Sequence, residues 1–255
     1  MPVTANGYCT PNQLVAVLPG LIIGSSADVT SDSIQAEIND VATKIRGSKQ
    51  RYPLISLNDH QSDLLGMINS PLAEAAIIRR RATDLKPENI RYAFAQEKFG
   101  KMLLDWYSTG KFIKSFVRSQ LIDSIALATV EECCWAMADF EPTEDDVSQP
   151  SYPSKPIIRI WIKRVSAVVY SIAHRLGYFV PQSPVNDDGI PTDLTADHLS
   201  IYGKIVRLIV GSMIVRVQKA QAKEVISLEA DDLLRQGIEL LIELASGKHF
   251  LTLKP

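Results

Sequence analysis

The sequence has few of the residues that build catalytic, metal or disulfide sites. Its 255 residues include only three cysteines and four histidines. Cys9, Cys133 and Cys134 are odd in number and two of them are adjacent, which indicates reduced thiols in a cytoplasmic protein. The histidines are scattered, and neither a His-x-x-x-His nor a Cys-x-x-Cys spacing occurs. We therefore expect no metal, no cofactor and no disulfide framework.

A catalytic cysteine is not expected either. A cysteine and a histidine far apart in the sequence can still meet in a fold, so the composition alone leaves a nucleophile pair open. However, nothing around Cys9 or Cys133 resembles a helix N-terminus with the basic neighbours that activate a thiol. The sequence therefore predicts that the protein is not an enzyme.

The sequence also lacks a large net charge and a long apolar run. A formal net charge of −2 gives no reason to expect a polyanion-binding protein. The most apolar segment, residues 205–217, is interrupted by Arg207, Gly211 and Arg216, so no membrane association is expected. Residues 1–8 show neither the basic nor the apolar region of a signal peptide. Because 46% of the residues are apolar, there is ample material for a core.

Two Gly-Lys pairs, at Gly110 and Gly247, do not belong to phosphate-binding loops. Such a loop connects a strand to a following helix. Here each pair follows a helical pattern, so the glycine is expected to end the helix. The lysine charge would then interact favourably with the helix dipole.

Helical signals fill the first half of the chain. Thr10, Pro11 and Gln13 form a capping box that predicts a short helix ending before Pro19. A second helix is expected from Ser31 or Asp32 to about residues 52–53. Its apolar residues recur in steps of four, three and four: Ile34, Ile38, Val41 and Ile45.

Two further helices are predicted before residue 112. The pair Ser70-Pro71 resembles a cap followed by proline at the first helical position, and it predicts a helix that runs to residues 79–81. Another helix is expected from about Pro87 to Ser108, where Gly110 ends it.

The second half repeats this order. Thr129 and Glu132 form another capping box, for a helix expected to stop near Phe140. Residues 158–176 carry an apolar stripe, and its first four residues have the same spacing as the apolar stripe of the second predicted helix. Residues 236–248 align without gaps on residues 99–111, so that Gly237 falls on Gly100.

The repeated order predicts a tandem duplication. We expect a mainly α fold of two tandem, related helical modules, residues 1–118 and 119–255. Each module should hold about four helices, long loops and a short strand-like tail at its end.

Three arginines close the third predicted helix: Arg79, Arg80 and Arg81. They could grip phosphates without reading bases, or they could pair with carboxylates at a subunit interface. The interface interpretation is preferred. The second half keeps only Arg216 and Lys219 nearby, so the triplet's role is not symmetric between the halves.

Both predicted modules end in apolar tails, which we interpret as contact surfaces for neighbouring subunits or rings. The residues concerned are Phe112, Ile113 and Phe116 in the first tail, and His249, Phe250, Leu251 and Leu253 in the second. The second tail alternates in a strand-like way, so it could fold back on its own module or add to the edge of a neighbour.

Residues 8–116 resemble the head–tail connector (adaptor, head-completion) proteins of tailed bacteriophages. The likeness rests on these features: Tyr8-Cys9-Thr10-x-x-x-Leu14, Arg51-Tyr52-Pro53-Leu54, the alanines Ala73, Ala75 and Ala76, and a last helix closing on Ser-x-Gly-Lys before an apolar tail. Residues 129–253 share it more weakly, through the internal repeat. Members of this family are normally one module long, so the duplication is a departure.

The resemblance implies a structural protein of the virion neck, at the head–tail junction, assembled in the host cytoplasm. It implies a homo-oligomeric ring, usually a dodecamer, that binds the portal protein and a downstream neck or tail protein. Genomic DNA would pass through the ring without sequence-specific contacts. Two alternatives are another neck or tail assembly protein (a stopper or terminator, which tend to be β-rich) and a helical DNA-binding protein that uses Arg79–Arg81.

Overall fold

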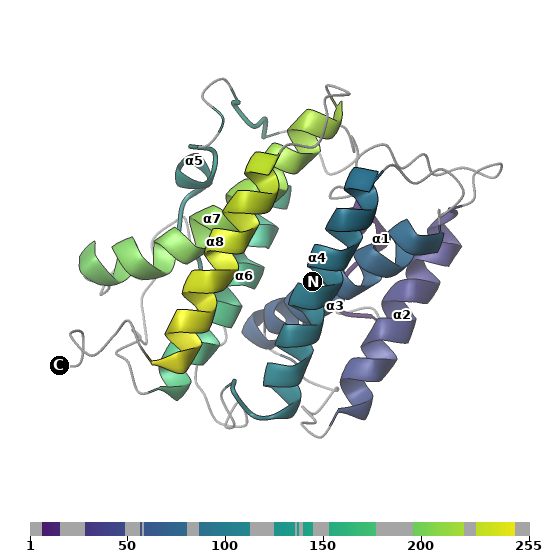
Figure 1. Ribbon diagram of the computed structural model, residues 1–255, viewed down its shortest axis with the longest axis horizontal. Coiled ribbons are helices and arrows are strands. Elements are labelled where there is room, and N and C mark those ends of the chain that lie inside the picture. The colour runs from purple at the N-terminus through teal and green to yellow at the C-terminus, as the bar shows by residue number, and fades with distance from the viewer. Residues whose placement is uncertain are drawn as a thin grey trace.

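All regular secondary structure in the described residues of the protein is helical. The computed structural model describes residues 7–15, 29–48, 57, 59–80, 87–112, 125–135, 137, 140–144, 153–176, 196–221 and 228–247. No strand occurs within them, which confirms the prediction of a mainly α fold (Figure 1). The predicted strand-like tails lie outside this part of the chain, except for Phe112.

Eight helices are formed by these residues. In chain order they are α1 (Pro11–Val15), α2 (Ser31–Gly47), α3 (Asp59–Arg80), α4 (Pro87–Ser108), α5 (Val130–Cys133), α6 (Lys155–Arg175), α7 (Ala196–Gln221) and α8 (Leu228–Ser246). We call α1 to α4 the first half and α5 to α8 the second half.

The predicted helix starts follow from local hydrogen bonds. At α1, the Gln13 side chain accepts a hydrogen bond from the Thr10 amide, and the Thr10 hydroxyl accepts one from the Gln13 amide. Thr129 and Glu132 make the same reciprocal pair at α5. Both predicted capping boxes are therefore confirmed, and each satisfies donors that a helix start leaves free.

The predicted helix ends at glycine are also confirmed. Gly110 and Gly247 have φ angles of 73° and 74°, a left-handed conformation that other residues adopt only at a cost. After α4 the Lys111 amide donates to the Trp106 carbonyl at 2.8 Å, which closes the last turn.

One predicted helix start was wrong. The pair Ser70-Pro71 does not begin a helix, because α3 already begins at Asp59 and Pro71 lies inside it. Proline removes a backbone donor and costs roughly 3 kcal/mol in a helix interior. The helix continues through it because apolar residues on both sides of the proline are buried: Leu64, Leu65, Ile68, Ala73 and Ile77.

Two predicted helix ends were placed too late. Helix α2 ends at Gly47, because Ser48 is extended and both its amide and its hydroxyl donate to the Ile45 carbonyl. Helix α5 ends at Cys133 rather than near Phe140. Beyond it, the Met137 amide donates to the Cys134 carbonyl and the Phe140 amide to the Met137 carbonyl, so each bond spans three residues instead of the four of an α-helix.

The two halves contain corresponding helix packings. Helix α3 packs against α2 and α4, and α7 packs in the same way against α6 and α8. The main helix contact between the halves joins α3 to α6. In Figure 1, α2 lies at one edge of the molecule and α7 reaches the opposite edge, while α4 and α8 both lie on the near side and run in the same direction.

One large hydrophobic core runs through both halves, and a smaller cluster of α7 and α8 residues lies apart from it. The large core includes both predicted stripes, which are buried: Ile34, Ile38, Val41 and Ile45 on α2, and Ile158, Ile162, Val165, Val169 and Ile172 on α6. The halves therefore share one core rather than burying separate ones.

Aligned glycines make the same close contacts in each half. A Cβ atom on Gly100 would lie 2.6 Å from the Leu72 side chain and 3.3 Å from its backbone nitrogen. A Cβ atom on Gly237 would lie 2.6 Å from the Ile209 side chain and 3.2 Å from its backbone nitrogen. The alignment that places Gly100 on Gly237 also places Leu72 on Ile209.

The same alignment places Gly66 on Gly203, and these residues again share a contact. A Cβ atom on Gly66 would lie 3.0 Å from the carbonyl oxygen of Tyr8, two residues before the Thr10 cap. A Cβ atom on Gly203 would lie 2.8 Å from the carbonyl oxygen of Leu127, two residues before the Thr129 cap. The segment before α1 therefore crosses α3 at Gly66, and the segment before α5 crosses α7 at the aligned Gly203.

Candidate functional site: the contact between the two halves

The contact between the halves centres on the buried side chain of Arg164 in α6. This residue is only 6% exposed. Its guanidinium donates to the Ser70 hydroxyl in α3 at 2.8 Å and to the Gln13 side-chain oxygen in α1 at 2.7 Å. A Cβ atom on Gly66 would lie 2.8 Å from the Arg164 Nε atom, so glycine leaves the room that the guanidinium occupies. One arginine thereby ties the second half to two helices of the first.

A second buried group joins α3, α4 and α7. The Tyr92 hydroxyl donates to the Glu74 carboxylate at 2.8 Å, and the Arg216 guanidinium lies over the Tyr92 ring. Burial raises the pKa of Glu74 to about 7, against the opposing effects of the Tyr92 hydrogen bond and of Arg216. Burial also raises the pKa of Tyr92 and lowers that of Arg216. The group is thus a packed polar network rather than an exposed acid–base pair.

A small cavity adjoins both polar groups. Its volume is about 10 Å³, room for roughly one water molecule. The amide oxygen of Gln96 in α4 has no hydrogen-bond partner among the described atoms. The cavity is lined by residues of both halves: Gln13, Met67, Ser70, Pro71, Glu74, Gln96, Trp161, Arg164 and Met213. A substrate pocket is usually ~30-fold larger or more, so this space fits a structural water better than a ligand.

The pH dependence of stability should reveal the buried Glu74. The unfolded carboxyl loses its proton near pH 4.5, whereas the folded one keeps it until about pH 7. The folded state binds more protons in this interval, so the contribution of Glu74 to stability falls as the pH rises from about 4.5 to 7. The difference in unfolding free energy between Glu74→Gln and the wild type should therefore shift in favour of the variant by about 3 kcal/mol as the pH rises from 5 to 8. Urea titrations at these pH values measure this gain, and a difference that does not change with pH would contradict it.

A third polar contact between the halves involves His60 of α3. Its ring lies 3.2 Å from the Ser171 hydroxyl of α6 and packs edge-on against Tyr170. Burial, with a smaller effect of His174, lowers the pKa of His60 to about 4. The imidazole is therefore neutral at physiological pH.

We expect His60 to make the fold sensitive to acid. Between about pH 6.5 and 4 the unfolded chain binds the proton and the folded chain does not, so the contribution of His60 to stability is lost as the pH falls. An NMR titration of the imidazole should give a midpoint near pH 4. A midpoint at pH 6 or above would show that the ring is not held in this buried site.

The cysteines are buried and protonated. The Cys9 thiol donates to the Asn69 side-chain oxygen at 3.3 Å, and the Asn69 amide donates to the Ile38 carbonyl. Burial raises the pKa of Cys9 and of Cys134 to about 11, and it raises that of Cys133 further. None of the three is poised to act as a thiolate nucleophile.

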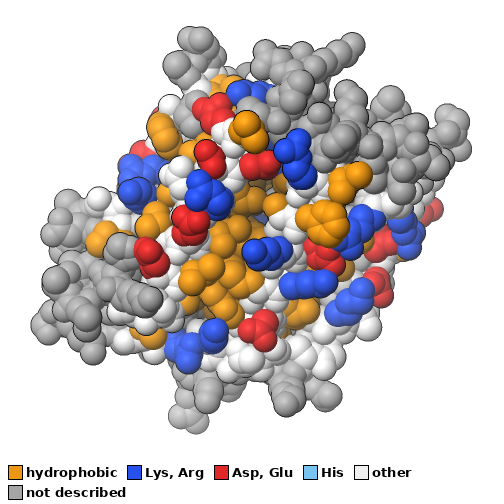
Figure 2. All heavy atoms as spheres, viewed as in Figure 1, with side chains coloured by type: hydrophobic (Ala, Val, Ile, Leu, Met, Phe, Trp, Pro, Cys, Tyr) orange, Lys and Arg blue, Asp and Glu red, His pale blue; other side chains and the backbone are white. Residues whose placement is uncertain are grey.

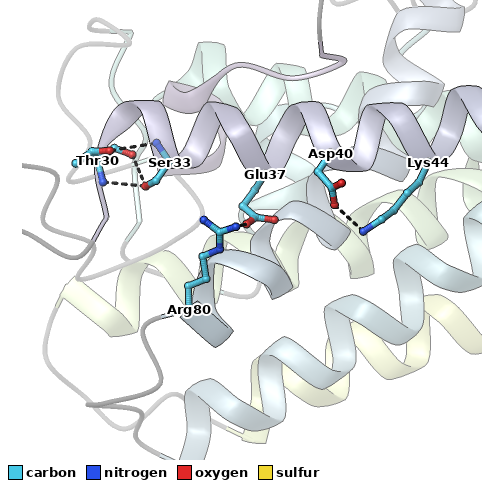
Figure 3. A network of polar contacts seen from close by, with 6 residues as sticks. All are labelled: Thr30, Ser33, Glu37, Asp40, Lys44 and Arg80. Atoms are coloured by element: carbon cyan, nitrogen blue, oxygen red, sulfur yellow. Dashed lines mark hydrogen bonds and ion pairs between the residues drawn. The ribbon is translucent and has the colours of Figure 1, made fainter.

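Two arginines of the predicted triplet pair with carboxylates of their own chain. Arg79 pairs with Glu97 of α4 and lies over the ring of Phe94. Arg80 pairs with Glu37 of α2 at 2.5 Å (Figure 3). Both side chains remain partly exposed, but their charges are matched within the chain. Arg81 lies outside the described residues.

The structure describes one of the predicted tail residues. Phe112 is fully buried and packs edge-on against Trp106, so it belongs to the core of the first half and not to an exposed contact surface. The other predicted tail residues lie outside the described part of the chain: Ile113, Phe116, His249, Phe250, Leu251 and Leu253.

Hydrophobic side chains are exposed on the near face of the molecule. Figure 2 shows them gathered along α8 and on its side toward α4, with charged side chains around them. The large exposed residues of these helices are Ile90 and Phe94 on α4, and Leu228 and Ile242 on α8. Exposed apolar areas of this kind suit contacts with other proteins.

Arg164 and Glu74 were not predicted from the sequence as residues of a site. The available signal was a charged residue within an otherwise apolar helical segment. Arg164 and Glu74 both lie among residues that the helical periodicity predicts to be buried. Sequence position alone does not show which partners such residues find.

Neither a metal site nor a membrane span is found in the described residues. No group of three or more His, Cys, Asp or Glu side chains is arranged there to hold a metal ion. None of the helices is long and apolar enough to cross a membrane, as far as they are described. No protein-family model matches the chain, and no curated protein or solved structure matches it either.

Proposed function

We propose that this chain is a structural subunit of a tailed-bacteriophage virion, forming a ring between the portal and the tail or neck. The ring would join the head to the tail and surround the DNA channel. The observation that carries the proposal is the way the two corresponding sets of helices pack together. Helix α3 of the first half contacts α6 of the second, so the two sets use different surfaces for this contact. A contact of this head-to-tail type can continue from subunit to subunit and close into a ring.

The proposal includes a tandem duplication of one helical module. Support comes from paired features at aligned positions: two capping boxes, two left-handed glycines and two pairs of close glycine contacts. If the short motifs were similar only by chance, there would be no reason for aligned glycines to contact aligned residues. Gly100 with Leu72, and Gly237 with Ile209, meet this stricter condition.

Motif residues behind the resemblance have structural roles. Tyr8 and Cys9 are buried, and Thr10 caps α1. Ala73 and Ala75 are buried within α3. These roles agree with a helical connector module in which no catalytic residue is needed. The alternative neck proteins tend to be β-rich, which the helical character of the described residues disfavours.

The charge pattern suits a ring through which DNA slides. Tight phosphate contacts would hold the DNA in place, and their affinity would fall steeply with salt. The chain has a net charge of −2, and Arg79 and Arg80 are matched by carboxylates. The pairing of Arg79 and Arg80 with carboxylates counts against the DNA-binding alternative, which relies on these arginines.

Light scattering tests the proposal. The purified chain of 28.2 kDa is measured alone and then mixed with the portal protein of the same phage. We expect a discrete ring, or a complex of fixed stoichiometry that forms only when the portal is present. A monomer that does not bind the portal under any salt condition would overturn the proposal.

A further inference from the structure

The buried contact between the halves uses one particular face of α6. Four of its residues face the first half or the shared core and are at most 6% exposed: Arg164, Ala167, Val168 and Ser171. Arg164 and Ser171 make the hydrogen bonds to Ser70 and His60 of α3. This face is what packs the second half onto the first.

The corresponding face of α2 is exposed and polar. The alignment of the apolar stripes, Ile34 on Ile158, places these four positions on Asp40, Thr43, Lys44 and Gly47, all of which are exposed. Asp40 and Lys44 pair with each other along α2, with side chains 58% and 62% exposed. Figure 3 shows this pair on α2, whereas Glu37 turns to Arg80 of α3. None of the described helices covers the face of α2 that corresponds to the buried face of α6.

Helix α7 leaves part of the surface that corresponds to that of α3 exposed, whereas the counterparts of Pro71 and Glu74, Leu208 and Gly211, are buried. The alignment places Ser70 on Arg207 and Met67 on Lys204. Lys204 is exposed, and the Arg207 side chain is 31% exposed, with Glu132 3.6 Å away. Within the chain, Arg164 of α6 meets Ser70 of α3. At the corresponding positions, α2 carries Asp40 and α7 carries Arg207. Each exposed surface thus carries both signs of charge, Asp40 with Lys44 on α2 and Arg207 with Glu132 at α7, so opposite charges can meet across a contact between them.

We infer that copies of this chain contact one another head to tail, with α2 of one copy packed on α7 of the next, as α6 packs on α3 within the chain. The inference rests on the proposed ring function and names the surface that builds the ring. In this arrangement Asp40 of one copy lies against Arg207 of the next, in the place of Arg164 against Ser70. The occupant of both surfaces is therefore a second copy of the chain.

The chemistry of the two faces sets the strength of this contact. The internal contact buries apolar residues such as Val168, whereas the corresponding residue of α2 is Lys44. A contact between polar, exposed faces is weak and is screened by salt. Copies should thus remain separable in solution and assemble at low ionic strength or on a template such as the portal.

Paired charge reversals test the inference. Asp40→Arg places arginine against Arg207, and Arg207→Asp places aspartate against Asp40, so each variant alone should lose assembly. Mixed one to one, they restore an opposite pair at every contact, and assembly should return. Arg235→Glu, which alters an exposed charge on α8, is the matched control and should assemble like the wild type. Sedimentation velocity at low and high salt, with and without portal protein, reads out assembly.

The outcomes separate this inference from the proposed function. Loss in both single variants with recovery in the mixture supports the α2–α7 contact, whether or not the portal is needed. If the wild type assembles on the portal and both single variants do so equally well, the contact is wrong and the ring function stands. If the wild type neither self-associates nor binds the portal, both are overturned. Circular dichroism of each variant shows that the helices are intact.

Discussion

Replacing Arg164 with alanine should lower the free energy of unfolding by about 3 kcal/mol or more. The change removes hydrogen bonds to Ser70 and Gln13 and leaves these polar groups beside an enlarged cavity. It also removes one of the two buried cations near Glu74, the other being Arg216. Because the lost contacts join the two halves, the structure predicts that both halves are destabilised together.

Urea unfolding followed by circular dichroism measures this effect. The control is Arg159→Ala on the same helix, whose half-exposed side chain pairs with Glu144 at the surface. It should change stability by no more than roughly 0.5 kcal/mol. Equal small effects in both variants would show that Arg164 does not hold the halves together.

Alanine at Gly100 or at Gly237 should destabilise the protein by about 1–3 kcal/mol. In each case the new methyl group would lie 2.6 Å from a side chain of the neighbouring helix and within about 3.3 Å of its backbone nitrogen. Alanine favours a helix over glycine by ~1 kcal/mol, so the packing penalty has to exceed this gain. Equivalent packing predicts penalties of similar size in the two halves.

Gly47→Ala separates the two effects. A Cβ atom at this position of α2 would meet nothing within 4 Å, so only the helix propensity changes and the variant should be neutral or slightly stabilised. Thermal and urea unfolding of the three variants can be compared directly. A neutral result at either Gly100 or Gly237 would contradict the close packing in that half.

Local chemistry made much of the fold predictable from the sequence. Capping boxes at Thr10 and Thr129 set helix starts, and Gly110 and Gly247 set helix ends, because their hydrogen bonds and φ angles depend on neighbouring residues. The apolar stripes of α2 and α6 showed which faces are buried. Such features need no knowledge of the tertiary structure.

Features that depend on distant residues were missed or misplaced. Pro71 was interpreted as a helix start because the same Ser-Pro pattern occurs at helix N-termini, and only the packing around α3 shows that the helix continues through it. Arg79 and Arg80 pair with Glu97 and Glu37 of the same chain, partners that the sequence did not indicate, and their place at a subunit interface stays a prediction. The partners of these charges lie on other helices, so their sequence position does not identify them.

The buried polar contacts were the least predictable part of the site. Arg164 meets residues of α1 and α3 that are far away in the sequence, and Glu74 meets Tyr92 of α4. Each arises only when the two halves pack, since it needs groups from at least two helices at once. The glycine contacts at aligned positions support the internal repeat that we propose from the sequence.

Electron microscopy of the chain assembled on its portal protein tests the central claim most directly. We expect a ring coaxial with the portal in which every chain contributes two similar helical lobes, joined by contacts that repeat between copies. A ring whose chains show a single lobe, or particles in which the portal carries no added density, would contradict it.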